Sequence, residues 1–439
     1  MAAVVSEEIP VTVLGLWHLG AVTAAGLARL GYRVTGLEMH ESRLKALVGG
    51  TPPIYEPGLA EMFGQEIASG RLSFVGDPRK AVANAEFVMF AEDVRVDEHD
   101  EPDISGLIDA AKTISPHLKP GTTLIVQSQV PVGTCARILQ VVQQANPHAE
   151  IHLAYCPENL RLGEAIRRFL HPDMIVIGVD TPAAQARLEE LFRPIEAPKV
   201  VMAVRSAEMT KHALNMLLAT AISFGNEIGA LCELVGADAV QVIRALRLDR
   251  RIGPGLPLDP GPPFSGGTLA RDVSVLRRLA MIHGVPAPLL EGVLAVNEAQ
   301  KTLALRRLEG TLGTLRGAQV GVLGLTYKAG TSTVRRSVAL ELVRALGARG
   351  ASVTAYDPFA DLSEADALPP FTRVADPYAA AHGADALVIM TDWPEFRTLD
   401  LRTLRDAMRG TVLIDTRNTL DATAAAAAGF TYCGVGRRA

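Results

Sequence analysis

The chain has little cysteine, few aromatic residues and no excess of positive charge. Its cysteines are far apart and form no CxxC pair, so the sequence predicts neither a zinc site nor a disulfide framework. A formal net charge of −5 excludes the broad basic surface that nucleic-acid-binding proteins need. No apolar run reaches the roughly 18 residues needed to span a bilayer, and the opening MAAVVSEEIP does not have the pattern of a signal peptide. We therefore expect a cytoplasmic protein that has no metal site and binds neither nucleic acid nor membrane. The cysteines are Cys135, Cys156, Cys232 and Cys433.

The 439 residues exceed what one ordinary hydrophobic core needs and predict two or three domains. Apolar residues make up 48% and charged residues 21%, as in an average folded enzyme. The composition gives no sign of disorder.

The first part of the chain shows strand and helix patterns in alternation. VTVLG (11–15) predicts a buried strand, the Ala- and Leu-rich stretch after it a helix, and YRVTGLE (32–38) a second strand. This is a βαβ unit. Further strands are expected at 87–91, 123–128 and 174–179.

From about residue 205 the pattern changes to apolar residues at helical spacing over some thirty positions, which predicts one long helix. A Gly- and Pro-rich loop follows at 251–267. A second α/β cycle then begins at 319–328, with strands at 352–358, 386–393 and 411–418. We expect an α/β protein with two Rossmann-like parallel-sheet domains joined by a long central helix. The predicted boundaries are 1–204, 205–300 and 301–439.

The turn after the first strand reads GLWHLG and matches the dinucleotide fingerprint G-x-G-x-x-G at Gly15 and Gly20. Trp17 stands at the second glycine, where a side chain must point aside or obstruct a pyrophosphate. Glu38, about twenty residues on, can accept hydrogen bonds from an adenosine ribose, which favours NAD over NADP. The alternative is an ordinary strand-to-helix turn followed by an incidental acid.

A series of short segments further along the chain occurs in a specific order. They are PIYEPGL (53–59), SQVPVGT (128–134), PENLRLG (157–163), EMTKHALN (208–215), GLTYK (324–328), RRS (335–337), TDW (391–393) and DTRN (415–418). From end to end, this series resembles the UDP-glucose/GDP-mannose dehydrogenase family. The resemblance implies an NAD-binding domain at 1–204, a central dimerisation domain at 205–300 and a UDP-sugar-binding domain at 301–439. It also implies a homodimer that uses NAD and a UDP-sugar or related nucleotide sugar.

The resemblance assigns two sets of binding residues. The cofactor-binding residues are Gly15, Trp17, Leu19, Gly20, Glu38, Ser128 and Arg335. The substrate-binding residues are Glu158, Leu160, Arg161, Lys211, Asn215, Arg251, Phe264, Gly266 and Lys328. Lys328 and Arg335 are cationic side chains able to hold a diphosphate, and Arg251 is expected to reach the site of a neighbouring subunit.

Lys211 and Asn215 are four residues apart, so on a helix both point from the same face. The family's equivalent pair is thought to position water and stabilise oxyanion charge while a hydride leaves the sugar. Together with Glu158, Asp272 and Thr268 they form the predicted catalytic set. The alternative is a surface lysine beside a helix-exterior amide.

The chain departs from the family at several site positions. SGGTLARD (265–272) resembles G-G-S-C-F-P-K-D, and counting back from Asp272 places Thr268 where the catalytic cysteine falls. A threonine hydroxyl is a poor nucleophile at neutral pH, whereas a thiol ionises near 8.5. Leu162 also replaces a glutamate, and Gln129 a threonine. Cys156 is close in sequence to Glu158, but a buried free cysteine is its commoner role and we do not assign it as nucleophile.

We therefore expect an NAD-dependent nucleotide-sugar oxidoreductase that performs a single hydride transfer. One alternative is a full UDP-glucose 6-dehydrogenase that yields a uronic acid. The other is a non-catalytic nucleotide-sugar-binding protein, suggested by the joint departures at Trp17, Leu162 and Thr268.

Overall fold

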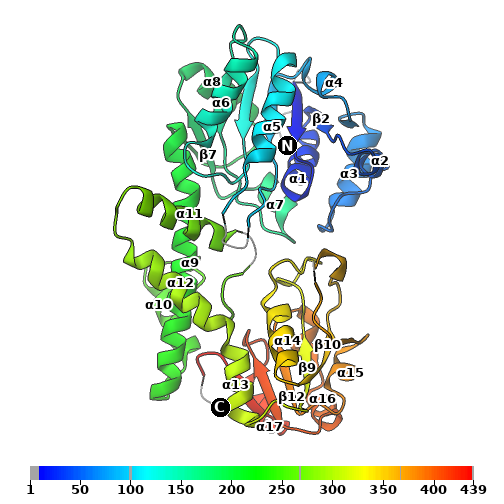
Figure 1. Cartoon of the computed structure of the whole chain (residues 1–439), viewed down its shortest axis with the longest axis vertical. Coiled ribbons are helices and arrows are strands. Elements are labelled where there is room, and N and C mark those ends of the chain that lie inside the picture. Colours follow the sequence, from blue (N-terminus) through cyan, green and yellow to red (C-terminus); the bar gives the residue numbers. More distant parts are fainter. Residues whose placement is uncertain (1–8, 98–100, 266–267, 366, 438–439) are drawn as a thin grey trace. The chain divides into compact units, whose positions relative to one another are not determined.

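The computed structural model describes residues 9–97, 101–265, 268–365 and 367–437. Its contacts divide the chain into two units, Met1–Ala213 and Leu214–Ala439. Each unit contains a sheet covered by helices (Figure 1).

In the described part of the first unit, eight strands form one sheet in the order β3-β2-β1-β4-β5-β6-β7-β8. All neighbouring strands are parallel except β6 and β7, which pair antiparallel. The strands are β1 Pro10–Leu14, β2 Arg33–Leu37, β3 Leu72–Val75, β4 Phe87–Phe90, β5 Thr123–Val126, β6 His152–Tyr155, β7 Ile175–Val179 and β8 Lys199–Met202.

Helices cover both faces of this sheet. They are α1 His18–Arg29, α2 Glu41–Val48, α3 Leu59–Ala68, α4 Pro78–Val82, α5 Ser105–Ile114, α6 Thr134–Ala145, α7 Ala165–Leu170 and α8 Pro182–Leu191, with a 3₁₀ turn η1 at Ser115–His117. One apolar cluster joins the sheet to α1, α3, α7 and α8, and a second joins it to α4, α5 and α6. Because strands buried on both faces need apolar side chains on both, these strands read as continuous apolar runs.

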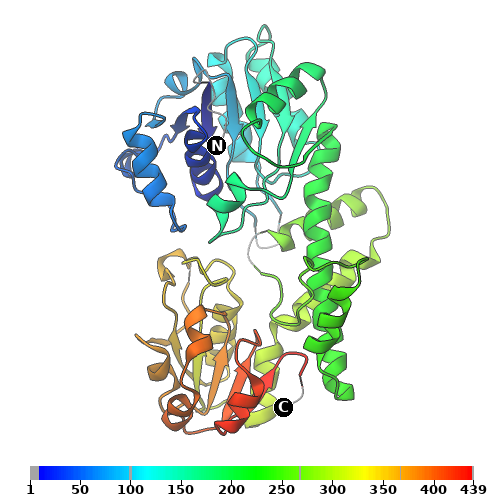
Figure 2. The same cartoon turned by 180° about the vertical axis from the view of Figure 1, so that it is seen from behind.

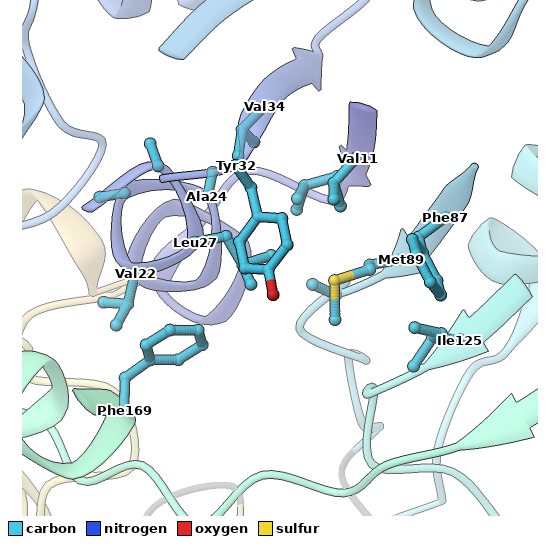
Figure 3. Packing of buried hydrophobic residues seen from close by; sticks show 14 of the residues in the cluster. Val11, Val22, Ala24, Leu27, Tyr32, Val34, Phe87, Met89, Ile125 and Phe169 are labelled. Atoms are coloured by element: carbon cyan, nitrogen blue, oxygen red, sulfur yellow. The ribbon is translucent and has the colours of Figure 1, made fainter. Parts of the chain in front are cut away.

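Tyr32 lies within the first of these clusters. Figure 3 shows its ring between helix α1 and the strand residues Val11 and Met89. Its hydroxyl donates a hydrogen bond to the Leu191 carbonyl at 2.6 Å, which satisfies the one polar atom of a fully buried ring.

Helix α9, Val204–Val235, is the predicted long helix. Its length and composition alone would admit a membrane span. However, Glu208, Lys211, His212 and Asn215 are buried polar residues on this helix, and each makes a hydrogen bond to another part of the protein. These contacts are those of a core helix.

The second unit contains a group of helices and a second sheet, seen from behind in Figure 2. Six of its described strands are all parallel, in the order β11-β10-β9-β12-β13-β14. The strands are β9 Gln319–Leu323, β10 Ser352–Tyr356, β11 Thr372–Arg373, β12 Ala386–Ile389, β13 Val412–Asp415 and β14 Thr431–Gly434. The helices are α10 Ala239–Leu248, α11 Leu269–Ile282, α12 Pro288–Lys301, α13 Leu303–Leu312, α14 Val338–Ala348, α15 Pro377–Ala381, α16 Leu401–Ala407 and α17 Ala422–Ala427, with 3₁₀ turns η2 Leu362–Glu364 and η3 Pro394–Thr398.

Two apolar clusters also cover the two faces of the second sheet, one with α13 and α14 and the other with α15, α16 and α17. The predicted fold class is confirmed. Strands β3, β6, β8, β11 and β14 were not among the strands named from the sequence, and the antiparallel pairing of β7 was not expected. β11 and β14 are short or expose alternate side chains, so their apolar signal is weak.

Candidate active site

The first and third glycines of the fingerprint are required by the packing of the turn between β1 and α1. Gly15 has a φ of 81°, and a Cβ there would lie 2.5 Å from the Glu92 Cα. A Cβ on Gly20 would lie 2.1 Å from the Gly15 carbonyl oxygen. Both positions therefore exclude a side chain, as a tight dinucleotide-type turn demands.

Trp17 occupies the N-cap position of α1 and is half-buried. The next residue, His18, is buried and its Nε2 lies 3.0 Å from Glu56 Oε2. The Glu56 carboxylate also accepts the amides of Gly163 and Ala165, each at 2.9 Å. Burial alone would raise the pKa of Glu56, but the hydrogen bonds from His18 and these amides lower it below its ordinary value. Glu56 thus ties the turn to the loop that carries the PENLRLG motif.

The remaining cofactor residues of the first unit lie at strand ends. The side chain of Glu38 follows β2, is 11% exposed, and accepts a hydrogen bond from the His40 amide at 2.8 Å. Its carboxylate fits the role of a ribose acceptor. Ser128 is buried and donates its hydroxyl to the Phe90 carbonyl at 3.2 Å.

The sequence reasoning missed Asp93. The Leu19 amide, in the first turn of α1, donates a hydrogen bond to Asp93 Oδ2 at 3.3 Å. Leu19 itself is buried. The sequence holds a partial signal, because Ala91 after the strand FVMF (87–90) is followed by two acids, Glu92 and Asp93.

Lys211 is only 7% exposed, so the alternative of a surface lysine is wrong. Its ammonium donates to the Glu158 carbonyl at 2.6 Å and to Asn159 Oδ1 at 3.1 Å. The Glu158 carboxylate turns back and accepts the Leu160 amide. Leu160 is half-buried and Arg161 is exposed. Lys211 therefore holds the loop at 157–163 against α9.

Asn215 and Asp272 form a second buried pair. The Asn215 amide nitrogen donates to Asp272 Oδ2, and both residues are almost fully buried. Thr268 is exposed at the N-cap position of α11, one turn before Asp272, and makes no side-chain capping bond. The structure therefore brings Asn215, Asp272 and the start of α11 together.

Three other predicted substrate residues lie in the second unit. Phe264 is buried, and its backbone exchanges two hydrogen bonds with the Asn297 side chain, at 2.8 and 3.0 Å. Arg251 is exposed and forms an ion pair with Asp249 at 2.7 Å. Gly266 lies outside the described residues.

A small pocket of mixed polar and apolar lining lies beside the turn after β9. It is lined by Pro262, Ser265, Thr326, Tyr327, Ser337, Val338, Ala339, Met390 and Arg417. The Arg417 Nε donates to the Met390 carbonyl at 3.1 Å, and burial lowers the pKa of this guanidinium. Arg417 was not assigned a role from the sequence, although it belongs to the DTRN motif. Lys328 is half-buried near the same turn, and Arg335 is exposed, with its amide donating to Thr333 Oγ1.

Two native thiols, those of Cys135 and Cys156, are poorly suited to nucleophilic chemistry. Burial raises the pKa of Cys156, and burial together with the Glu208 carboxylate raises that of Cys135. Cys156 therefore behaves as a core residue, which agrees with leaving it unassigned.

Comparisons with known proteins match nearly the whole length of the chain. Residues 9–196 match the NAD binding domain of the UDP-glucose/GDP-mannose dehydrogenase family, 205–299 its central domain, and 321–422 its UDP binding domain. The chain is 38% identical to a UDP-glucose 6-dehydrogenase of Rhizobium meliloti (strain 1021), over 97% of this chain and 99% of that one. It is 35% identical to a UDP-glucose 6-dehydrogenase of Bacillus subtilis (strain 168), over 98% and 93%.

Solved structures give the same result. A UDP-glucose dehydrogenase from the hyperthermophilic archaeon Pyrobaculum islandicum superimposes with a TM-score of 0.90 at 34% identity, and 99% of each chain is covered. The similarity therefore extends over both sheets and the helices between them.

Proposed function

Because the chain belongs to the UDP-glucose/GDP-mannose dehydrogenase family, we propose that it is a cytoplasmic, NAD-dependent oxidoreductase that removes one hydride from a UDP-sugar. Bound NAD supplies the hydride acceptor. The residues of this chain supply the binding groups and the fixed charges. The proposed parts are the NAD-binding domain at 1–204, the central dimerisation domain at 205–300 and the UDP-sugar-binding domain at 301–439.

In the first unit, the glycines of the turn and Glu38 would hold the dinucleotide. Glu38 offers a carboxylate to the adenosine ribose, and Gly15 permits the tight turn that leads into α1. The Lys211 ammonium, fixed by the Glu158 carbonyl, would stabilise negative charge on the sugar oxygen as its proton leaves.

In the second unit, Arg417 beside the small pocket and the cation of Lys328 would contact the nucleotide part of the substrate. Asn215, held by Asp272, would orient the reacting oxygen or a water molecule.

The observation that carries the single oxidation is Thr268. It is exposed at the start of α11, one turn before the buried Asp272, and it bears a hydroxyl where the resemblance expects a thiol. No thiolate would trap an aldehyde at this position, so the reaction stops after the first hydride.

The test is the stoichiometry of NADH on a panel of UDP- and GDP-sugars. One NADH per sugar with an aldehyde or keto product supports the proposal. Two NADH per sugar with a uronic acid product would establish the full UDP-glucose 6-dehydrogenase reaction instead.

A second candidate is a nucleotide-sugar-binding protein without catalysis. It is favoured by the Asp93 carboxylate on the Leu19 amide, which repels a diphosphate, and by Trp17, which places a side chain where the fingerprint has its second glycine. Micromolar NAD binding by calorimetry would count against this candidate.

We also propose a homodimer formed through the helices at 205–300. Leu217, Phe224 and Leu231 recur at seven-residue spacing on α9 and are 55%, 43% and 54% exposed. Such an apolar stripe is a typical helix–helix contact surface. Light scattering should give twice the chain mass. Leu231→Glu should shift the protein to monomer, whereas Lys80→Glu, an exposed change on α4 outside residues 205–300, should not.

A further inference from the structure

Two acidic residues, Glu92 and Asp93, follow β4 after a single residue, Ala91, at the edge where the fingerprint turn lies. The Ala91 amide donates to the Leu14 carbonyl at 2.9 Å, which keeps the end of β4 paired with the end of β1. The next residue, Glu92, brings its backbone so close to Gly15 that an added Cβ would lie 2.5 Å from the Glu92 Cα. The chain after β4 is therefore held against the turn by backbone packing.

The two carboxylates then diverge. The Glu92 carboxylate lies beside Gly106 at the start of α5, where a Cβ would be 2.6 Å from Glu92 Oε1. Asp93 instead accepts the Leu19 amide in the first turn of α1, at 3.3 Å. Of the two carboxylates, Asp93 is therefore the one that these contacts place at the start of α1.

The first turn of a helix presents amides that have no partner within the helix, and the helix dipole adds partial positive charge there. In α1 this turn contains no acidic residue of its own. Asp93 therefore supplies, from the segment after β4, the negative charge that a dinucleotide's diphosphate supplies at such a turn.

We propose that the Asp93 carboxylate is an internal competitor for the diphosphate of the cofactor, and that Asp93 sets the affinity of this turn for nucleotides. The cofactor must displace this carboxylate or bind beside a like charge. This inference rests on the proposed use of NAD. It adds one residue that tunes the binding.

The experiment is calorimetric titration of the full-length protein with ADP, and with adenosine as a probe that lacks phosphate. Saturating UDP is present throughout, so that ADP does not bind in the UDP binding domain. Asp93→Asn removes the charge but keeps a side-chain oxygen for the Leu19 amide, and Asp93→Ala removes both. Asp77→Asn is the matched control, because Asp77 caps α4 in the same unit and Asn is an equally good cap.

We expect Asp93→Asn and Asp93→Ala to bind ADP about tenfold more tightly than the wild type, which corresponds to about 1.4 kcal/mol. Adenosine affinity should stay unchanged in both, and Asp77→Asn should match the wild type for both probes. Thermal melts of all variants check that each remains folded.

Equal ADP affinity in the wild type and both Asp93 variants would overturn the inference while leaving NAD use intact. A gain that appears equally with adenosine would also overturn it, because the effect would then not act on the diphosphate. If neither probe binds to any variant, both this inference and the proposed cofactor are rejected.

Discussion

The side-chain amide of Asn215 donates a hydrogen bond to the carboxylate of Asp272, and both groups are buried. A buried carboxylate needs donors, because removing one partner leaves charge that water cannot solvate. This pair therefore supports the start of α11, where Thr268 lies.

Exchanging the two groups tests this pair. Asn215→Asp alone places two carboxylates together and should lower the free energy of unfolding at pH 7 by about 3 kcal/mol. Combining N215D with D272N restores one amide and one carboxylate and should recover most of that loss. Urea denaturation of the wild type, N215D, D272N and the double variant gives the coupling energy. If the two single losses of stability simply add in the double variant, the pairing is contradicted.

The Glu56 carboxylate joins the fingerprint turn to the loop at 157–163 through His18, Gly163 and Ala165. Glu56→Gln should lower the free energy of unfolding at pH 7 by about 1 to 3 kcal/mol. The pKa of Glu56 is lowered in the folded protein. The ionised Glu56 carboxylate therefore makes its full contribution to the free energy of unfolding above pH 4.5, the ordinary pKa. This contribution is lost as the pH falls through the lower pKa of the folded protein.

The wild type and Glu56→Gln should thus converge in stability below about pH 4.5. Glu61→Gln is the control, because Glu61 is an exposed glutamate on the neighbouring helix α3. Urea denaturation from pH 7 to pH 3.5 measures all three proteins. A difference between wild type and Glu56→Gln that is constant over this range would rule out the ionised carboxylate as its cause.

Thr268→Cys would introduce a thiol that is exposed at the N-terminus of a helix, where the thiolate is favoured. Iodoacetamide at pH 7.5 should modify this thiol much faster than Cys135 and Cys156, whose pKa values are raised by burial. The variant should also raise the NADH yield toward two per sugar. Thr268→Ser is the control, and an unchanged yield in a folded, alkylatable cysteine variant would show that the missing thiol is not what limits the reaction.

The sequence predicted the parts of the fold in which local pattern and tertiary environment agree. The βαβ unit that begins at 11–15 and the long helix α9 both have strong apolar periodicity, and both are present. β8 was missed because it is not a buried strand: its middle residues, Val200 and Val201, are exposed. The prediction looked for buried apolar runs, and this strand does not form one. No local sequence signal shows that β7 runs antiparallel to β6, because the direction of a strand is set by the path of the chain that connects the two.

The same distinction holds for the site. The lysine at 211 and the amide at 215 were predicted from spacing on one helix, but their partners come from distant segments. Lys211 is bonded to the loop at 158–159, and Asn215 to Asp272. Asp93 was missed because its role depends on the contact between the ends of β1 and β4, which periodicity does not reveal.

Two glycines in helices should respond oppositely to alanine. Gly20 lies in α1, where a Cβ would meet the Gly15 carbonyl at 2.1 Å, so Gly20→Ala must distort the fingerprint turn. Gly64 lies in α3, where a Cβ would meet nothing within 4 Å, so Gly64→Ala should raise the free energy of unfolding by about 0.5 to 1 kcal/mol through the higher helix propensity of alanine. We expect Gly20→Ala to lower it by about 2 kcal/mol or more, in line with overpacking of a tight contact, and to weaken NAD binding. Urea denaturation and calorimetry measure the two effects. A Gly20→Ala protein as stable as the wild type would mean that the turn between β1 and α1 is looser than its packing indicates.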